Sequence, residues 1–161
     1  MCFRYFNACG AEPFNHDLGQ APGASHIIAR VLESKLADKP FTLNGNDYAT
    51  PDRTCIRDYI HVWDLADAHI RAIEWILNLS EKPAAVFNLG TQHGISNQEI
   101  IDYVLLNYGT VTVTVGPRRA GDPDRLVANA DLAYQTLGWK PNYSTINQIV
   151  DSAYRWYTRD L

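Results

Sequence analysis

The chain has 161 residues, of which 46% are hydrophobic and 20% are charged, values typical of one globular domain. Its formal net charge of −4 argues against a partner such as nucleic acid or an anionic membrane. No apolar run reaches the length of about 18 residues that a membrane span needs. The first residues do not resemble a secretion signal, and the three cysteines lack metal-site spacing, so we expect reduced thiols and a cytoplasmic location.

The first half of the chain indicates short strands around one amphipathic helix. Residues 2–6 are apolar and aromatic, which predicts a buried strand that ends at Asn7. Residues 8–25 have little apolar periodicity and predict a loop, whereas apolar residues in 26–37 recur with the spacing of one helix face. Further short strands are expected at 41–43 and 56–62.

Helix signals dominate the second half. Asp64 occupies the N-cap position of a helix that we expect to end near Leu79. The pattern Ser-x-x-Glu at 96–99 is a capping box that predicts a helix over 97–107, with Gly109 as its stop.

The remaining elements complete a mixed pattern. Residues 111–115 alternate with a period of two, as strands do. We also expect a strand at 86–89, a short helix capped by Asp131 that stops at Gly138, and a last helix at about 146–158. This order predicts an α/β fold (mixed α+β) that is too short for a complete doubly wound sheet.

The most distinctive motif is the run from Thr50 to His69, T-P-D-R-T-C-I-R-D-Y-I-H-V-W-D-L-A-D-A-H. Three more segments stand in a matching order: Arg4-Tyr5-Phe6-Asn7 with Gly10-Ala11, the helix start at 25–28, and Asn88-Leu89-Gly90 followed by 116–122. Together these segments closely resemble UDP-glucose 4-epimerases, which are nucleotide-sugar members of the extended short-chain dehydrogenase/reductase superfamily. The resemblance extends over essentially the whole chain.

The resemblance implies the C-terminal, substrate-binding part of an extended Rossmann-type epimerase. Residues 1–161 would form one UDP-sugar-binding region that includes remnants of the last Rossmann strands near 2–6 and 86–89. The glycine-rich NAD-binding half would be missing. In the intact family enzyme NAD is the cofactor, and we expect none to bind to this chain alone.

Two features of the family are absent from the sequence. No G-x-G-x-x-G or G-x-x-G-x-x-G pattern exists, although such a turn lets the backbone approach a dinucleotide pyrophosphate. The catalytic Tyr-x-x-x-Lys pair is also absent, because the residues four positions before the four lysines are Val31, Lys35, Asn78 and Thr136. We therefore expect no catalytic residue here and no turnover by the chain alone.

Several residues match family positions that hold the diphosphate and ribose. Arg57 and Arg119 would bind the diphosphate, because a guanidinium offers a planar fork that stays charged. Asn7 would hold the same part of the substrate, and Asp122 would accept hydrogen bonds from the ribose. Taken without the resemblance, Arg57 could form an internal ion pair, Asp122 could cap its loop, and Asn7 could form a turn. Arg118 is expected to be a solvated neighbour or a structural pair.

Other residues match positions around the base. His26 and Ile27 open a helix, where free backbone N–H groups could meet uracil or phosphate oxygens. Thr42 and Asn44 would flank the uracil, and His93 would lie by the nucleotide. By itself His26 is typical of an ordinary surface histidine.

The sugar and cofactor positions are less distinctive. Leu126 aligns with a position that shapes the hexose pocket, which leaves glucose and N-acetylglucosamine both open. Tyr5 aligns with a residue that approaches the nicotinamide or the sugar, although an aromatic residue in such a strand is also typical of a core. No metal site is expected, and the motif residues Asp58, Tyr59, His61, Asp64 and Asp67 are expected to fold the loop and cap the helix.

Two further hypotheses remain open. The chain could be a non-catalytic UDP-sugar-binding or interaction module, or half of a related UDP-N-acetylhexosamine or UDP-uronate epimerase. Its partners would be a UDP-hexose and a missing NAD-binding half. Without that half, the strands near 2–6 and 86–89 would expose unpaired edges, so we also expect self-association.

Overall fold

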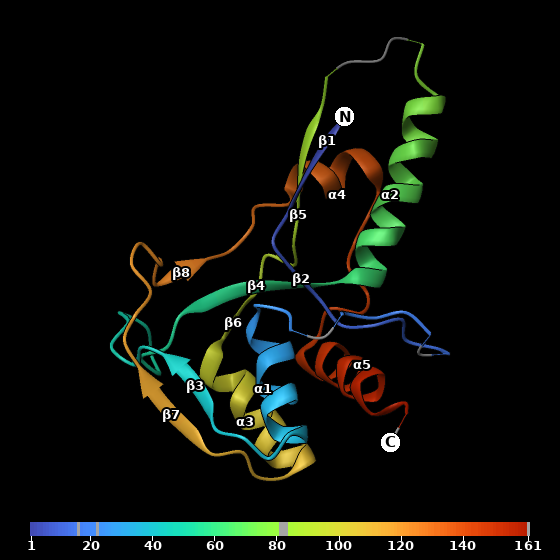
Figure 1. Ribbon diagram of the computed structural model, residues 1–161. Coiled ribbons are helices and arrows are strands. Elements are labelled where there is room, and N and C mark those ends of the chain that lie inside the picture. The colour runs from blue at the N-terminus through green and yellow to red at the C-terminus, as the bar shows by residue number, and fades with distance from the viewer. Residues whose placement is uncertain (16, 22, 81–83, 161) are drawn as a thin grey trace.

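The computed structural model describes residues 1–15, 17–21, 23–80 and 84–160. Short strands alternate with helices along the chain (Figure 1). The strands are β1 (Cys2–Tyr5), β2 (Asn7–Cys9), β3 (Phe41–Asn44), β4 (Ile56–His61), β5 (Val86–Leu89), β6 (Gly94–Ser96), β7 (Val113–Gly116) and β8 (Arg125–Leu126). The helices are α1 (Ile27–Leu36), α2 (Val62–Leu77), α3 (Asn97–Tyr108), α4 (Asp131–Leu137) and α5 (Ile146–Thr158).

Strand β4 is the centre of the fold. It pairs in parallel with β2 and β8 and antiparallel with β6. Two separate parallel pairs, β1 with β5 and β3 with β7, lie on either side of it. Figure 1 shows β4 crossing between an upper group of β1, β5, α2 and α4 and a lower group of α1, α3, α5, β3 and β7. The mixed α/β class expected from the sequence is confirmed.

Two hydrophobic cores follow from this arrangement, because successive residues of β4 point to opposite faces. Tyr59 packs into a core with α1, α3 and α5, and its neighbour Ile60 packs into a second core with α2, β5 and α4. The second core contains Trp139, which is fully buried and donates its indole N–H to the Asp64 carbonyl at 2.9 Å.

Most expected elements are confirmed within a residue or two of their predicted ends. The capping box is present: Ser96 Oγ accepts from Glu99 N, and the Glu99 carboxylate accepts from Ser96 N. Gly109 at φ 91° and Gly138 at φ 59° end their helices in backbone conformations that favour glycine. The helix that Asp131 was expected to cap has Ala130 as its N-cap, and Asp131 is its first residue.

The prediction that Asp64 caps α2 is wrong. The N-cap is His61, whose Nδ1 accepts from Trp63 N at 3.0 Å. The Asp64 carboxylate is buried and instead accepts from the backbone of Asn142 and Tyr143 and from Ser144 Oγ. It therefore holds the loop before α5, which no local pattern could indicate.

The strand predicted at 2–6 is present as β1 but is not buried, and the loop predicted at 8–25 is wrong at its start, because Ala8 and Cys9 belong to β2. The chain changes partner at Phe6, so Tyr5 ends β1 against β5 and Asn7 begins β2 against β4. Within the described residues β1 has a partner on one side only, which leaves Tyr5 49% exposed. The alternating segment expected at 111–115 forms β7 from Val113 onward, and both of its valines are exposed.

Exposed apolar side chains on α2 lead to a testable prediction. Ile70, Ile73 and Leu77 form a stripe on one face of the helix, and they are 57%, 57% and 71% exposed. Together with the free edges of β1 and β5, this stripe should make the isolated chain self-associate at micromolar concentrations. We expect Ile73→Glu to reduce the sedimentation-equilibrium mass, whereas Leu106→Glu on α3 leaves it unchanged. A monomeric wild-type chain at high concentration would contradict the prediction.

Candidate functional site

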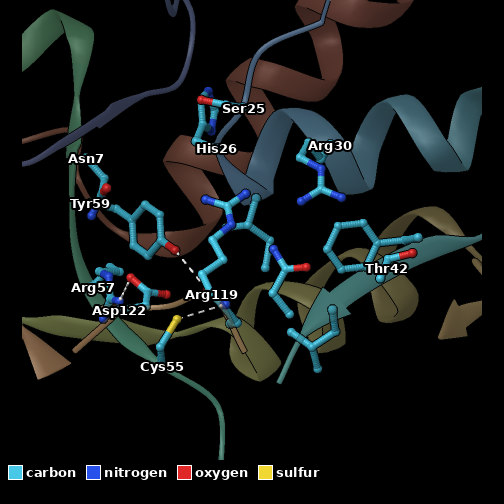
Figure 2. Close-up of a pocket in the computed structure, with 15 residues that line it drawn as sticks. Asn7, Ser25, His26, Arg30, Thr42, Cys55, Arg57, Tyr59, Arg119 and Asp122 are labelled. Atoms are coloured by element: carbon cyan, nitrogen blue, oxygen red, sulfur yellow. Dashed lines mark hydrogen bonds and ion pairs between the residues drawn. The ribbon is translucent and has the colours of Figure 1, made fainter. Parts of the chain in front are cut away.

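A cavity of about 190 Å³ lies between α1, β3, β4 and the loop after β7 (Figure 2). Among the described residues, eight of the ten substrate-binding candidates line it: Asn7, His26, Ile27, Thr42, Asn44, Arg57, Arg119 and Asp122. These residues come from segments more than 100 positions apart, so only the folded chain brings them together. Their roles toward a ligand stay predictions.

Arg57 and Asp122 form an ion pair in the cavity wall. Arg57 Nη2 donates to Asp122 Oδ1 at 2.6 Å, and the two side chains are 10% and 29% exposed. Arg57 Nη1 donates to the Ile56 carbonyl, and Tyr48 donates its hydroxyl to the other Asp122 oxygen at 3.3 Å. Burial, reinforced by the Asp122 charge, raises the pKa of Tyr48, so its hydroxyl keeps the proton that it donates. The pair leaves guanidinium N–H groups of Arg57 for a ligand.

The two adjacent arginines after β7 have different environments. Arg118 lies over the Tyr48 ring at 4.0 Å and pairs with Asp124 at 2.9 Å, which confirms the expected structural role. Arg119 lines the cavity, is exposed, and makes no ion pair with any residue in the described ranges. Arg119 is therefore the guanidinium of this loop that is available to an anion.

His26 precedes α1 as its N-cap residue, but its side chain makes no capping bond. Both ring nitrogens are buried and have no hydrogen-bond partner among the described residues. Burial lowers the pKa of His26, so the ring is neutral at pH 7 and can both donate and accept. This ring is thus not the ordinary surface histidine that its sequence context alone indicated. Ile27, the first residue of α1, lies beside it in the cavity.

The other lining candidates are held by the strands. Asn7 donates its side-chain amide to the Asp58 carbonyl at 3.1 Å, which bridges β2 and β4. Thr42 Oγ1 lies 3.2 Å from Thr114 Oγ1 across the β3–β7 pair. The Asn44 carbonyl lies 3.2 Å from the Tyr48 hydroxyl and shares its proton with Asp122.

Three candidates lie outside this lining. His93 is exposed and borders a different pocket with Thr91 and Tyr134. Leu126 on β8 is 49% exposed and pairs in register with Arg57. Tyr5 donates its hydroxyl to His69 Nε2 at 2.7 Å, because His69 Nδ1 must donate to the Leu65 carbonyl.

Several further residues line the cavity that were not predicted from the sequence. Arg30 lies one turn after His26 on α1, a spacing of four that places both on one helix face and could have indicated it. Tyr59 donates its hydroxyl to Asn97, and Asn97 contacts Cys55 Sγ. Burial raises the pKa of Tyr59 and of Cys55, so both are uncharged at pH 7.

The charges of the lining favour an anionic ligand. The lining contains three guanidinium groups, those of Arg30, Arg57 and Arg119, and one carboxylate, that of Asp122. Within the residues that the structure describes, no cluster of three or more His, Cys, Asp or Glu side chains could hold a metal ion. None of the described helices has both the length and the apolar character to cross a bilayer.

Comparison with known proteins assigns the chain to a class. Residues 1–90 match the NAD dependent epimerase/dehydratase family. The chain belongs to that family.

Particular relatives give a narrower comparison. The chain is 41% identical to the UDP-glucose 4-epimerase of Lacticaseibacillus casei over 98% of its own length and 47% of the relative's. For the enzyme of Rhizobium meliloti the identity is 41%, over 99% of this chain and 48% of the relative. The crystal structure of the Bifidobacterium longum UDP-glucose 4-epimerase in complex with NAD⁺ and UDP superposes with a TM-score of 0.86 at 35% identity, covering 98% of this chain and 47% of that one.

The chain therefore spans about half the length of the curated relatives that it matches. Two observations concern NAD, the cofactor of the intact family enzyme. The Tyr5 hydroxyl, the group expected to approach the cofactor, is bonded to His69, and the strand–helix junctions carry no glycine-rich turn in the described ranges.

Proposed function

We propose that the cavity binds the nucleoside diphosphate part of a UDP-hexose, and that the protein contributes the substrate-binding half of a UDP-glucose 4-epimerase. One observation carries the proposal: eight residues expected from the family resemblance surround one cavity. The excess of guanidinium groups suits a diphosphate, because charge-assisted bonds from arginine to phosphate oxygens are strong and can be bidentate. The relatives named above are UDP-glucose 4-epimerases.

The cavity is small for a whole nucleotide sugar, since ligand sites usually measure about 300–1,000 Å³. A shallow groove continues from it and shares Arg30, Asn44 and Arg119 with the cavity wall. We infer that part of the ligand occupies this groove. The chain supplies binding and orientation only, and we expect no epimerisation without a separate NAD-binding partner.

Calorimetric titration of UDP into the purified chain tests the proposal. We expect saturable binding that weakens by about 10- to 100-fold in Arg119→Ala, the range expected when hydrogen bonds to a charged group are lost. Arg155→Ala removes the same charge from the exposed face of α5, outside the cavity, and should leave the affinity unchanged.

Two outcomes would contradict parts of the proposal. Absence of UDP binding to the wild-type chain would mean that the described residues do not form a working nucleotide site. Conversion of UDP-galactose to UDP-glucose by the chain with NAD alone would show that it contains a cofactor site and catalytic groups. A panel of UDP-glucose, UDP-N-acetylglucosamine and UDP-glucuronate would then identify the preferred sugar.

A further inference from the structure

Arg30 has a position in the cavity that its sequence context does not explain. Its guanidinium lies over the Phe41 ring, 5.5 Å from the ring centre. Across the described ranges, its side chain makes no ion pair and no hydrogen bond. Figure 2 shows this side chain leaving α1 toward Thr42 on β3, on the opposite side of the view from the Arg57–Asp122 pair, with Arg119 between them.

Strand β3 supplies backbone groups at the same end of the cavity. Among the described strands it pairs with β7 alone. Phe41 N donates to Thr112 O and Gly45 N donates to Gly116 O, so these N–H groups point toward β7. Because peptide groups alternate in direction along a strand, the N–H and C=O of Thr42 point away from β7. Thr42 lines the cavity, and its backbone thus offers one donor and one acceptor without a strand partner.

The proposed function determines which part of the ligand reaches this end. If Arg57 and Arg119 hold the diphosphate, the base extends toward His26, Thr42 and Arg30. A guanidinium only donates hydrogen bonds, so it fits a base edge that presents an oxygen acceptor. Uracil presents a carbonyl oxygen at position 4, whereas cytosine presents an amino donor there.

We propose that Arg30 is a specificity-determining residue that donates to a uracil carbonyl oxygen and makes the cavity favour uridine over cytidine nucleotides. The Thr42 carbonyl accepts from the uracil N3–H in the same arrangement. Cytosine would set its amino group against the guanidinium and its unprotonated N3 against the Thr42 carbonyl, which leaves these groups without partners. This inference rests on the proposed function, because it needs the diphosphate at Arg57 and Arg119.

The test measures UDP, CDP and inorganic pyrophosphate binding to the wild-type chain and to Arg30→Met by calorimetry. Sites that hydrogen-bond a polar edge discriminate strongly against analogues that lack the matching group, so we expect the wild type to favour UDP over CDP by about tenfold or more. In Arg30→Met this ratio should fall about tenfold, whereas pyrophosphate affinity should change less than about twofold, since pyrophosphate has no base.

A second variant keeps the test decisive if the methionine substitution disturbs folding. Arg30→Gln provides an amide oxygen that can accept from the cytosine amino group, so its CDP affinity should rise relative to UDP. Equal weakening of UDP, CDP and pyrophosphate in Arg30→Met would make Arg30 a general phosphate contact and overturn the inference. An unchanged UDP-to-CDP ratio in both variants would overturn it as well.

The same titrations separate this inference from the proposed function. If the wild-type chain binds UDP but Arg30 substitutions leave the base preference intact, only the role of Arg30 fails. If the wild-type chain binds none of the three compounds, the nucleotide site itself fails, and the Arg30 assignment fails with it.

Discussion

Replacing Asp58 by asparagine should destabilise the chain by about 3 to 5 kcal/mol, a large fraction of the total stability of a domain of this size. The Asp58 carboxylate is fully buried in the described structure. One oxygen accepts from the backbone and hydroxyl of Thr91, at 2.8 and 2.7 Å, and the other accepts from Gln92 N and Ala128 N, at 3.0 and 3.1 Å. Asparagine keeps the shape, but in either orientation its NH₂ group faces at least one backbone N–H donor, that of Thr91 or those of Gln92 and Ala128.

The loss would be large because those donors could not reach water. An unsatisfied buried donor costs about 1–3 kcal/mol, and the substitution leaves at least one, while the remaining donors lose a charged acceptor worth about 1.5–3 kcal/mol. The site has no spare room, since a Cβ on Gly90 would lie 2.7 Å from Asp58 Oδ2 and 2.5 Å from the Ala128 Cβ. Asp58 therefore joins β4, the loop after β5 and the segment before α4.

Urea unfolding followed by circular dichroism would measure this effect. Asp67→Asn is the matched control, because Asp67 is partly exposed on α2 and pairs with Arg71 at 2.7 Å with a spacing of four. An exposed pair of this kind contributes about 0.3–0.5 kcal/mol. Similar losses in the two variants would refute the role assigned to the Asp58 carboxylate.

Acidification should destabilise the chain through His61, the second large effect that we expect. His61 is buried, and burial lowers its pKa to about 4, against a partial upward effect of the Asp64 charge. Its Nδ1 accepts from Trp63 N, so Nε2 carries the proton and donates to Ser152 Oγ at 3.0 Å. Protonation of Nδ1 would place a new N–H against the N–H of Trp63. It would also add a positive charge at the N-terminus of α2, which is the positive end of the helix dipole.

The sign of the pH dependence follows from the lowered pKa. The unfolded chain takes up a proton near pH 6.5 and the folded chain only near pH 4, so the contribution is complete above pH 6.5 and is lost as the pH falls between these values. The loss reaches on the order of 3 kcal/mol. Gly10 at φ 82° leaves the ring little space to move, because a Cβ there would lie 2.6 Å from it.

Comparison with His61→Asn isolates this effect from that of the carboxylates and of His26, which also titrate in acid. Asparagine is a good N-cap that does not titrate, so it should preserve helix α2. Between pH 6.5 and 4.5, the free energy of unfolding should fall more steeply for the wild type, by up to about 1.4 kcal/mol per pH unit. Parallel curves would rule out His61 as the titrating group.

Local patterns predicted the helices of this protein well. The Ser96–Glu99 capping box, the stops at Gly109 and Gly138 and the apolar stripe of 146–158 each depend on residues within a few positions of one another. The family motifs indicated most of the cavity lining, with residues on α1 and its N-cap, on strands β2, β3 and β4, and in the loop after β7.

The tertiary structure decided the contacts between residues that are distant in the sequence. The Asp64 carboxylate binds a loop about 80 residues away instead of capping its own helix, and Ala8 and Cys9, predicted as loop, form part of β2 because they pair with β4. The spacing of four from His26 could have placed Arg30 on the same helix face, but its contact with the Phe41 ring depends on the packing of α1 over β3. By itself, the sequence determined the helices and the chemical groups available to the site. The fold decided which of those groups lie next to one another. Hydrogen bonds and burial between segments that are far apart in the sequence contribute free energy that the local periodicity of the sequence does not reveal.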